Sequence, residues 1–185
     1  MKKSSALAYV GHNANNNREE NDFYPTPEYA TQALLNKQKF EGNIWECACG
    51  DGAMSKVIIN NGYNVYSSDL IDRGYGETGI DFLSSTKQVD NIVTNPPFNL
   101  ATEFTLKAFE LSKHKVVMLS KVSYLEGLKR HQQIFSKNKL EKVLVFIRRV
   151  PFKKKSTNGK AAGLMAFGWF IYDMNYNGLP TIDWI

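Results

Sequence analysis

Short apolar segments alternate with helical patterns along most of the chain. Runs rich in β-branched and aromatic side chains predict strands at residues 43–48, 64–69, 90–95 and 115–120. Between and after them, apolar residues recur at intervals of three and four, as on one face of an amphipathic helix, over about 54–60, 100–111 and 126–136. Such alternation is typical of a parallel sheet with helices on both faces.

Three further segments complete the predicted sheet. A short strand is expected at 79–83, reached through linkers too short for full-length helices. Strand-like segments at 142–150 and 165–174 flank the turn signal Asn158-Gly159, which predicts an antiparallel hairpin. We therefore predict an α/β fold of the Rossmann-like, doubly wound kind, with a mainly parallel seven-stranded sheet and a C-terminal antiparallel hairpin.

The beginning of the chain is a polar leader. Its segment 11–17, Gly-His-Asn-Ala-Asn-Asn-Asn, cannot bury enough apolar surface to fold alone. We expect a flexible arm over residues 1–22 and a single domain over residues 23–185, in which Thr26 caps a first helix that ends near Asn36. With 185 residues, 43% of them hydrophobic, the chain is long enough for one substantial core.

The positive charge is concentrated in one segment. The net charge is +5, and the segment 148–160 contains no acid but six cations, namely Arg148, Arg149, Lys153, Lys154, Lys155 and Lys160. A run of charge is usually a solvated loop, and the alternative is a patch that contacts the phosphates of a nucleic acid.

Nothing in the composition points to a metal centre or a membrane. Cys47 and Cys49 are one residue apart, too strained a spacing for an ordinary disulfide, and no further Cys/His pair completes a zinc site. No apolar run approaches the roughly 18 residues that span a bilayer, and the start of the chain lacks the apolar stretch of a signal peptide. We expect a cytoplasmic protein without a metal.

The residues that directly follow strands are the candidates for ligand binding, because doubly wound sheets bind ligands at the carboxyl ends of their strands. After the first strand, the turn 46–52 is made of small residues and glycines that allow close approach to a ligand, although glycine also occurs there for packing. Asp69, after the second strand, could accept hydrogen bonds from ribose hydroxyls or be an ordinary turn aspartate. Asp81 could accept a hydrogen bond from an adenine amine while Phe82 packs against the ring.

The segment Asn95-Pro96-Pro97-Phe98 after the fourth strand is the most specific motif. Two prolines lack backbone donors and restrict φ, so they fix the Asn95 side chain and the Pro96 carbonyl as acceptors. Such a pair suits an aromatic amine, a poor nucleophile that becomes more reactive when its nitrogen is pyramidal and lies in line with an activated methyl group. Phe98 offers a face for stacking a base. The alternative is a rigid loop that only ends a strand.

Taken in order, these motifs resemble those of the class I amino-methyltransferases of DNA, and in particular the small N6-adenine methyltransferases of phages and prophages. The motifs are Tyr24-Pro25-Thr26-Pro27, the turn 46–52, Asp69, Asp81-Phe82 and Asn95-Pro96-Pro97-Phe98, and the resemblance covers the chain from about Phe23 to its end. It implies a methyltransferase domain with S-adenosylmethionine as cofactor and the N6 amine of adenine in DNA as methyl acceptor, in the cytoplasm of a bacterial host or a phage-infected cell.

The resemblance also implies roles for individual residues. The cofactor would be bound by Tyr24, Thr26, Glu46, Ala48, Gly50, Gly52, Asp69, Asp81 and Phe82. The catalytic segment would be Asn95, Pro96, Pro97 and Phe98, with Asn95 and Pro96 holding the target amine and Phe98 stacking on a flipped base. The basic segment would contact phosphates, and Phe152 within it would be a second stacking partner.

Two features depart from the family pattern. Members often have a full helix between the second and third strands, where residues 71–78 can hold only a loop, and many carry a separate target-recognition domain for which this chain has no room. Similar Asn-Pro-Pro-aromatic loops occur in enzymes that methylate adenine in structured RNA or glutamine in protein, and the basic segment disfavours protein. An alternative of another class is a non-catalytic nucleic-acid-binding module with a degenerate cofactor pocket.

Overall fold

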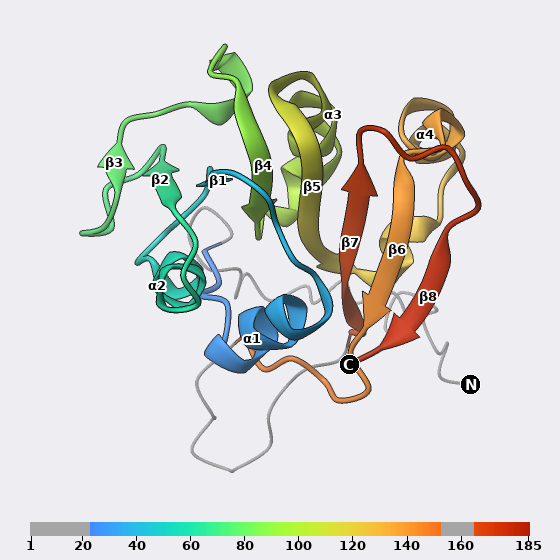
Figure 1. Ribbon diagram of the computed structural model, residues 1–185, viewed down its shortest axis with the longest axis horizontal. Coiled ribbons are helices and arrows are strands. Elements are labelled where there is room, and N and C mark those ends of the chain that lie inside the picture. The colour runs from blue at the N-terminus through green and yellow to red at the C-terminus, as the bar shows by residue number, and fades with distance from the viewer. Residues whose placement is uncertain (1–22, 153–164) are drawn as a thin grey trace, which may run out of the picture.

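The computed structural model of the chain describes residues 23–152 and 165–185 (Figure 1). The arm predicted over residues 1–22 lies outside these ranges, as do Lys153, Lys154, Lys155 and Lys160 of the basic segment. The division of the chain into arm and domain therefore stays a prediction.

An eight-stranded sheet forms the centre of the described part, with the order β3-β2-β1-β4-β5-β7-β6-β8. Its strands are β1 (Ile44–Glu46), β2 (Val65–Asp69), β3 (Glu77–Thr78), β4 (Val89–Thr94), β5 (Ser112–Lys121), β6 (Leu140–Val145), β7 (Phe167–Asp173) and β8 (Thr181–Trp184). Only β7 runs antiparallel to its neighbours, β5 and β6, and the other pairs are parallel. The α/β, doubly wound, mainly parallel fold with a C-terminal antiparallel hairpin is confirmed.

Two helices cover each face of the sheet (Figure 1). The helices α1 (Glu28–Lys37) and α2 (Ala53–Asn60) lie on one face, and α3 (Ala101–Leu111) and α4 (Leu128–Gln133) lie on the other. The core accordingly consists of two clusters, one between the strands and both α1 and α2, the other between the strands and α3, with Ile134 just after α4. Both faces of the sheet are therefore buried, as is usual for parallel sheets.

The central strand β5 shows how the sequence produces this arrangement. Its residues 116–119, Val-Val-Met-Leu, are all fully buried. Val117 and Leu119 belong to the cluster under α1 and α2, while Val116 and Met118 belong to the cluster under α3. Successive side chains of a strand point to opposite faces, so an uninterrupted apolar run is what a strand covered on both sides requires.

Several predicted elements differ from the structure. The strand expected at 79–83 is instead a 3₁₀ turn at Phe82–Ser84, and the third strand is the exposed pair Glu77–Thr78. The seven-stranded count was one short because β8 was not foreseen. Thr26 does not cap α1, since Pro27 occupies the N-cap position and no side chain caps the helix. The helix expected at 126–136 is split into α4 and a 3₁₀ turn at Phe135–Lys137.

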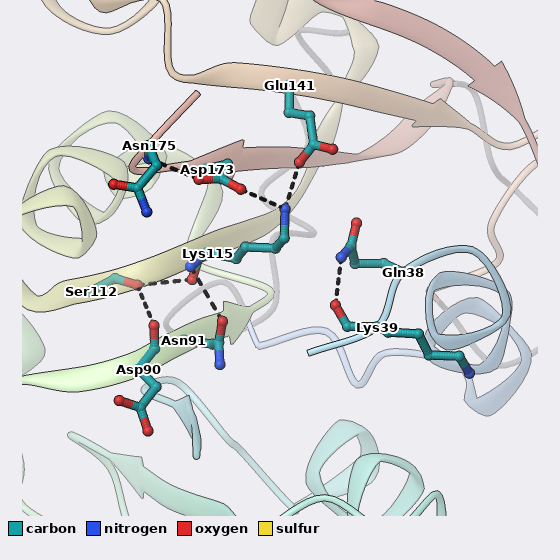
Figure 2. A network of polar contacts seen from close by, with 9 residues as sticks. All are labelled: Gln38, Lys39, Asp90, Asn91, Ser112, Lys115, Glu141, Asp173 and Asn175. Atoms are coloured by element: carbon teal, nitrogen blue, oxygen red, sulfur yellow. Dashed lines mark hydrogen bonds and ion pairs between the residues drawn. The ribbon is translucent and has the colours of Figure 1, made fainter. Parts of the chain in front are cut away.

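A polar network fastens the antiparallel strands to the parallel part of the sheet (Figure 2). The Lys115 ammonium of β5 donates to Glu141 at 2.7 Å and to Asp173 at 2.9 Å, which joins β5, β6 and β7. The same residue reaches β4, because its backbone N–H donates to Asn91 Oδ1 at 3.3 Å. The network lies near the amino end of β5, so it is structural and leaves the carboxyl ends of the strands available for a ligand.

Within the described ranges, no helix is both long enough and apolar enough to cross a lipid bilayer. Among the same residues, no three His, Cys, Asp or Glu side chains are grouped so that they could hold a metal ion.

Candidate active site

A cavity of about 400 Å³ opens at the carboxyl ends of β1, β2 and β4. Its wall includes most of the residues predicted from the sequence to bind the cofactor or the target, namely Tyr24, Thr26, Glu46, Ala48, Gly50, Asp69, Asp81, Phe82, Asn95 and Pro97. Three predicted residues, Gly52, Pro96 and Phe98, are not part of the wall. The structure therefore brings together side chains from three strand ends and from the segment before α1.

The glycine turn after β1 is shaped by close approach of two aromatic rings. Gly50 has a φ of +56° and Gly52 has a φ of +77°, a region that favours glycine. A Cβ at Gly50 would lie 2.4 Å from the Phe23 ring, and one at Gly52 would lie 2.4 Å from the Tyr75 ring. Gly52 therefore serves the packing of the loop between β2 and β3, whereas Gly50 faces the cavity beside Phe23.

Asp69 holds two backbone turns at the end of β2. One carboxylate oxygen accepts a hydrogen bond from Gly50 N at 2.8 Å, and the other accepts one from Ile71 N at 2.9 Å. A carboxylate has about four acceptor positions. The side chain therefore ties the glycine turn to the following loop and keeps capacity for donors of a ligand in the cavity.

Glu46 is a buried carboxyl group in the cavity wall, with 2% of its surface exposed. Burial raises its pKa to about 8, although a hydrogen bond from Ser55 Oγ opposes the shift. Ser55 Oγ in turn lies 2.6 Å from Ser67 Oγ. Because burial disfavours the charged form, Glu46 carries a proton at neutral pH in the free protein.

Asp81 and Phe82 also line the cavity. Asp81 accepts a hydrogen bond from Leu83 N at 3.0 Å, which caps the 3₁₀ turn. The Phe82 ring lies at 5.2 Å from Trp45 and 5.0 Å from Phe104, centroid to centroid. Phe82 is therefore a core residue that also lines the cavity, and its ring cannot turn freely.

Asn95, at the end of β4, has an amide group of fixed orientation. Its Nδ2 donates to the Tyr24 carbonyl oxygen at 3.0 Å and lies 3.1 Å from Thr26 Oγ1. Since a carbonyl oxygen can only accept, the nitrogen must lie on that side. The other amide atom, Oδ1, is buried and has no hydrogen-bond partner among the residues that the structure describes. An unsatisfied buried acceptor costs about 1–3 kcal/mol, so a donor brought to this position would be stabilised.

Phe98 lies in an aromatic cluster with Tyr24, Phe152 and Phe167. The Tyr24 ring is stacked on it at 5.5 Å with an interplanar angle of 21°, while Phe152 and Phe167 pack at 6.1 and 5.6 Å. The Lys121 ammonium lies 5.3 Å from the Phe98 ring centroid. One face of Phe98 is thus covered by Tyr24, so a base that stacks on Phe98 from that side requires the Tyr24 ring to move.

The described part of the basic segment lies at the end of β6. Arg148 and Arg149 are exposed there, and Phe152 is half-buried in the aromatic cluster. The chain therefore leads from the exposed arginines directly to the aromatic rings near the cavity. The four lysines of the segment lie beyond the described residues.

Sequence reasoning missed several residues of the cavity wall. Arg73 lies with its guanidinium carbon 4.0 Å from the Phe23 ring centroid, and both residues line the cavity, as does Phe104 of α3. Cys47 and Cys49 also line it as free thiols, and burial raises the pKa of Cys49 to about 12. Burial also raises the pKa of the Cys47 thiol well above its ordinary value.

No protein-family model matches the chain, and no curated protein matches it in sequence. Solved structures do match. The "putative RNA methyltransferase PH1948" of Pyrococcus horikoshii superposes with a TM-score of 0.65 at 18% identity, over 94% of this chain and 98% of that one. The magnesium protoporphyrin IX methyltransferase of Synechocystis PCC 6803 with bound SAM gives a TM-score of 0.53 at 11% identity, over 79% and 78% of the two chains.

The chain has the fold of these methyltransferases. At such identities the likeness concerns the fold alone. It spans 94% of this chain and nearly the whole of the Pyrococcus horikoshii protein, so the likeness concerns one shared architecture rather than an isolated motif.

Proposed function

We propose that the chain is an S-adenosylmethionine-dependent methyltransferase that methylates the N6 amine of adenine in DNA. The observation that carries the proposal is the Asn95 amide. Its nitrogen is engaged by Tyr24 and Thr26, and its buried oxygen has no partner within the described residues of a cavity that Asn95 itself lines. An exocyclic amine is a donor that suits such an acceptor.

The cavity fits the proposed cofactor in size and in the chemistry of its wall. About 400 Å³ lies within the range of about 300–1,000 Å³ that is usual for small-molecule sites. Asp69 and Asp81 are acceptors for ribose hydroxyls and for the adenine amine, and Phe82 is an apolar surface for the adenine ring. The Glu46 carboxyl group can accept a hydrogen bond from the amino group of the methionine end.

S-adenosylmethionine would supply a methyl group on a positively charged sulfur. In the proposed reaction, the N6 nitrogen forms a bond to this methyl carbon, the carbon–sulfur bond breaks, and S-adenosylhomocysteine and a proton are released. Asn95 Oδ1 accepts a hydrogen bond from the amine and orients its lone pair, and the two prolines limit the movement of this acceptor. Positioning and electrostatic stabilisation account for the rate enhancement, and no covalent intermediate is required.

Aromatic and basic groups around the site support a nucleic acid as substrate. Tyr24, Phe98 and Phe152 are rings on which an extruded base can stack, and Arg148 and Arg149 are exposed cations near them. The same groups suit RNA, and the name of the archaeal protein makes RNA the second candidate. A glutamine side chain of a protein is a less favoured substrate, because a neutral amide carries no negative charge for a basic segment to bind.

Methyl transfer by the purified protein tests the proposal. The protein is incubated with S-adenosylmethionine labelled in the methyl group and with equal masses of DNA and RNA, and the nucleosides are separated after digestion. We expect the label in N6-methyldeoxyadenosine, with Asn95→Ala inactive and Asn60→Ala, an exposed asparagine on α2, fully active.

Other outcomes reject specific parts of the proposal. Label in RNA alone would replace the substrate, and label in another position of the base would reject the role of Asn95 Oδ1. Calorimetry that detects no S-adenosylmethionine binding would favour the non-catalytic binding module.

A further inference from the structure

An exposed apolar patch lies at the far edge of the sheet from the cofactor cavity. The patch consists of Ile147, Ile182 and Trp184, which are 73%, 55% and 60% exposed. They come from the end of β6 and from the neighbouring edge strand β8, which pair in parallel with Val145 opposite Trp184. The backbone N–H of Ile147 donates to the Ile185 carbonyl at 2.9 Å, so the patch continues beyond the last strand pair.

The register shows which face of β8 carries the patch. Asp183 forms an ion pair of 2.9 Å with Lys37 of α1, so it faces the α1 side of the sheet. Ile182 and Trp184 are its neighbours in a strand and point to the opposite side. On that side they lie next to Val143 and Val145, their partners on β6, which pack in or against the cluster under α3. The patch extends this apolar face beyond the last residues that the core covers.

Although they lie at different strands, the patch and the active site are both found at the carboxyl ends of parallel strands. Because β4, β5, β6 and β8 run parallel, the ends of all four strands meet there, and Figure 1 shows the arrowheads of β4, β6 and β8 pointing the same way. From β4 to β8 there are four strand spacings of about 4.8 Å, or roughly 19 Å. For a strand that keeps the stacked, helical rise of about 3.4 Å per nucleotide, this distance corresponds to about six nucleotides.

The charge around the patch is positive. Arg148 and Arg149 follow Ile147 and are exposed. Asp183 on β8 is engaged by Lys37, on the other face. An exposed indole close in the chain pairing to the exposed Arg148 is what a polyanion with unpaired bases would recognise, because bases stack on aromatic rings and phosphates bind cations.

We propose that Trp184, Ile147 and Arg148 form a second contact site for the nucleic acid, where an unpaired base about six nucleotides from the target adenine stacks on the indole. This inference rests on the proposed function and adds a substrate class to it. The substrate would be a DNA strand whose nucleotides on the β8 side of the cavity are unpaired. The flank supplies affinity and register.

Intrinsic fluorescence gives a direct readout, because the three tryptophans of the chain differ in exposure. Trp45 and Trp169 are fully buried and Trp184 is exposed. Acrylamide should therefore quench Trp184 alone in the free protein. Addition of a single-stranded DNA 12-mer, with its adenine at one end and S-adenosylhomocysteine present, should protect Trp184 from acrylamide. A trinucleotide that contains the same adenine should not protect it.

Variants then measure the contribution of the contact. Trp184→Ala should weaken binding of the 12-mer by about tenfold. Trp184→Phe, which keeps an aromatic ring, should bind the 12-mer within about twofold of the wild type. Neither variant should change methylation of the trinucleotide or binding of S-adenosylmethionine. Leu179→Ala, a substitution of an exposed residue before β8, is the matched control and should change nothing.

The outcomes separate this inference from the proposed function. If the wild type methylates the 12-mer while Trp184 stays as accessible to acrylamide as in the free protein, the contact site is rejected and the enzyme stands. If the wild type binds no oligonucleotide, both are rejected. Protection of Trp184 that grows with protein concentration in the absence of DNA, together with dimers in sedimentation, would assign the patch to a second copy of the chain instead.

Discussion

Replacement of the buried Glu46 carboxyl by an amide should change how stability depends on pH. The folded protein holds Glu46 with a pKa of about 8, and the unfolded chain holds it near 4.5. The folded state therefore keeps a proton that the unfolded state releases as pH rises. This difference lowers the free energy of unfolding by about 1.4 kcal/mol per pH unit between the two pKa values of 4.5 and about 8, or about 5 kcal/mol in total.

The variant Glu46→Gln lacks this titration and keeps a group that can bond with Ser55. Urea denaturation at several pH values from 5 to 9, without cofactor, compares it with the wild type. We expect the stability of the variant relative to the wild type to rise steadily across this range and to level off above about pH 8. Glu126→Gln, which removes an exposed carboxyl group, controls for the loss of one charge. A difference between Glu46→Gln and wild type that is the same at every pH would refute the reasoning, since it would mean that burial does not hold the proton on Glu46.

Three further predictions follow from the same structure. Gly52→Ala should lower the stability, measured by thermal unfolding, by about 1 kcal/mol or more beyond the loss caused by Gly62→Ala. Both glycines have a positive φ, but only at Gly52 does an aromatic ring lie where the Cβ would be. Equal losses would reject the steric explanation. Asn95→Ala should lower kcat about 10²–10³-fold, by analogy with the loss of one oriented polar group in other active sites. Its affinity for S-adenosylmethionine in calorimetry should change only a few-fold. A loss of cofactor affinity as large as the loss of kcat would contradict the role of Asn95 toward the amine. Lys115→Met should cost about 1.5–3 kcal/mol in urea denaturation because two carboxylates lose their shared partner. Lys107→Met, which removes an ion pair with the single, exposed Glu110, should cost under about 0.5 kcal/mol. Similar losses would show that the network adds little.

The parts of the fold that the sequence predicted are those whose side chains are buried periodically. The four central strands were located because apolar runs such as 116–119 are covered on both faces. The strand β8 was missed because its apolar residues Ile182 and Trp184 are exposed, so no burial pattern marks it. The pair Glu77–Thr78 forms β3 through backbone pairing with β2, and two exposed polar residues carry no such signal.

The candidate site was predictable to the extent that it follows from topology. Residues directly after parallel strands meet at one edge, so Glu46, Asp69 and Asn95 could be grouped before the structure was known. The orientation of the Asn95 amide could not, because it depends on the backbone carbonyl of Tyr24, 71 residues earlier in the chain. Arg73 was also out of reach, since a loop residue acquires its place in a cavity only through the tertiary packing of its neighbours.

The central claim is that this chain transfers a methyl group to the N6 amine of adenine in DNA by means of the Asn95 acceptor. Mass spectrometry of nucleosides from the genomic DNA of cells that lack this modification, and that express either the wild-type chain or Asn95→Ala, tests it most directly. We expect N6-methyldeoxyadenosine in the DNA of the cells with the wild-type chain and none with the variant. Unmodified DNA in both, or equal modification in both, would contradict it.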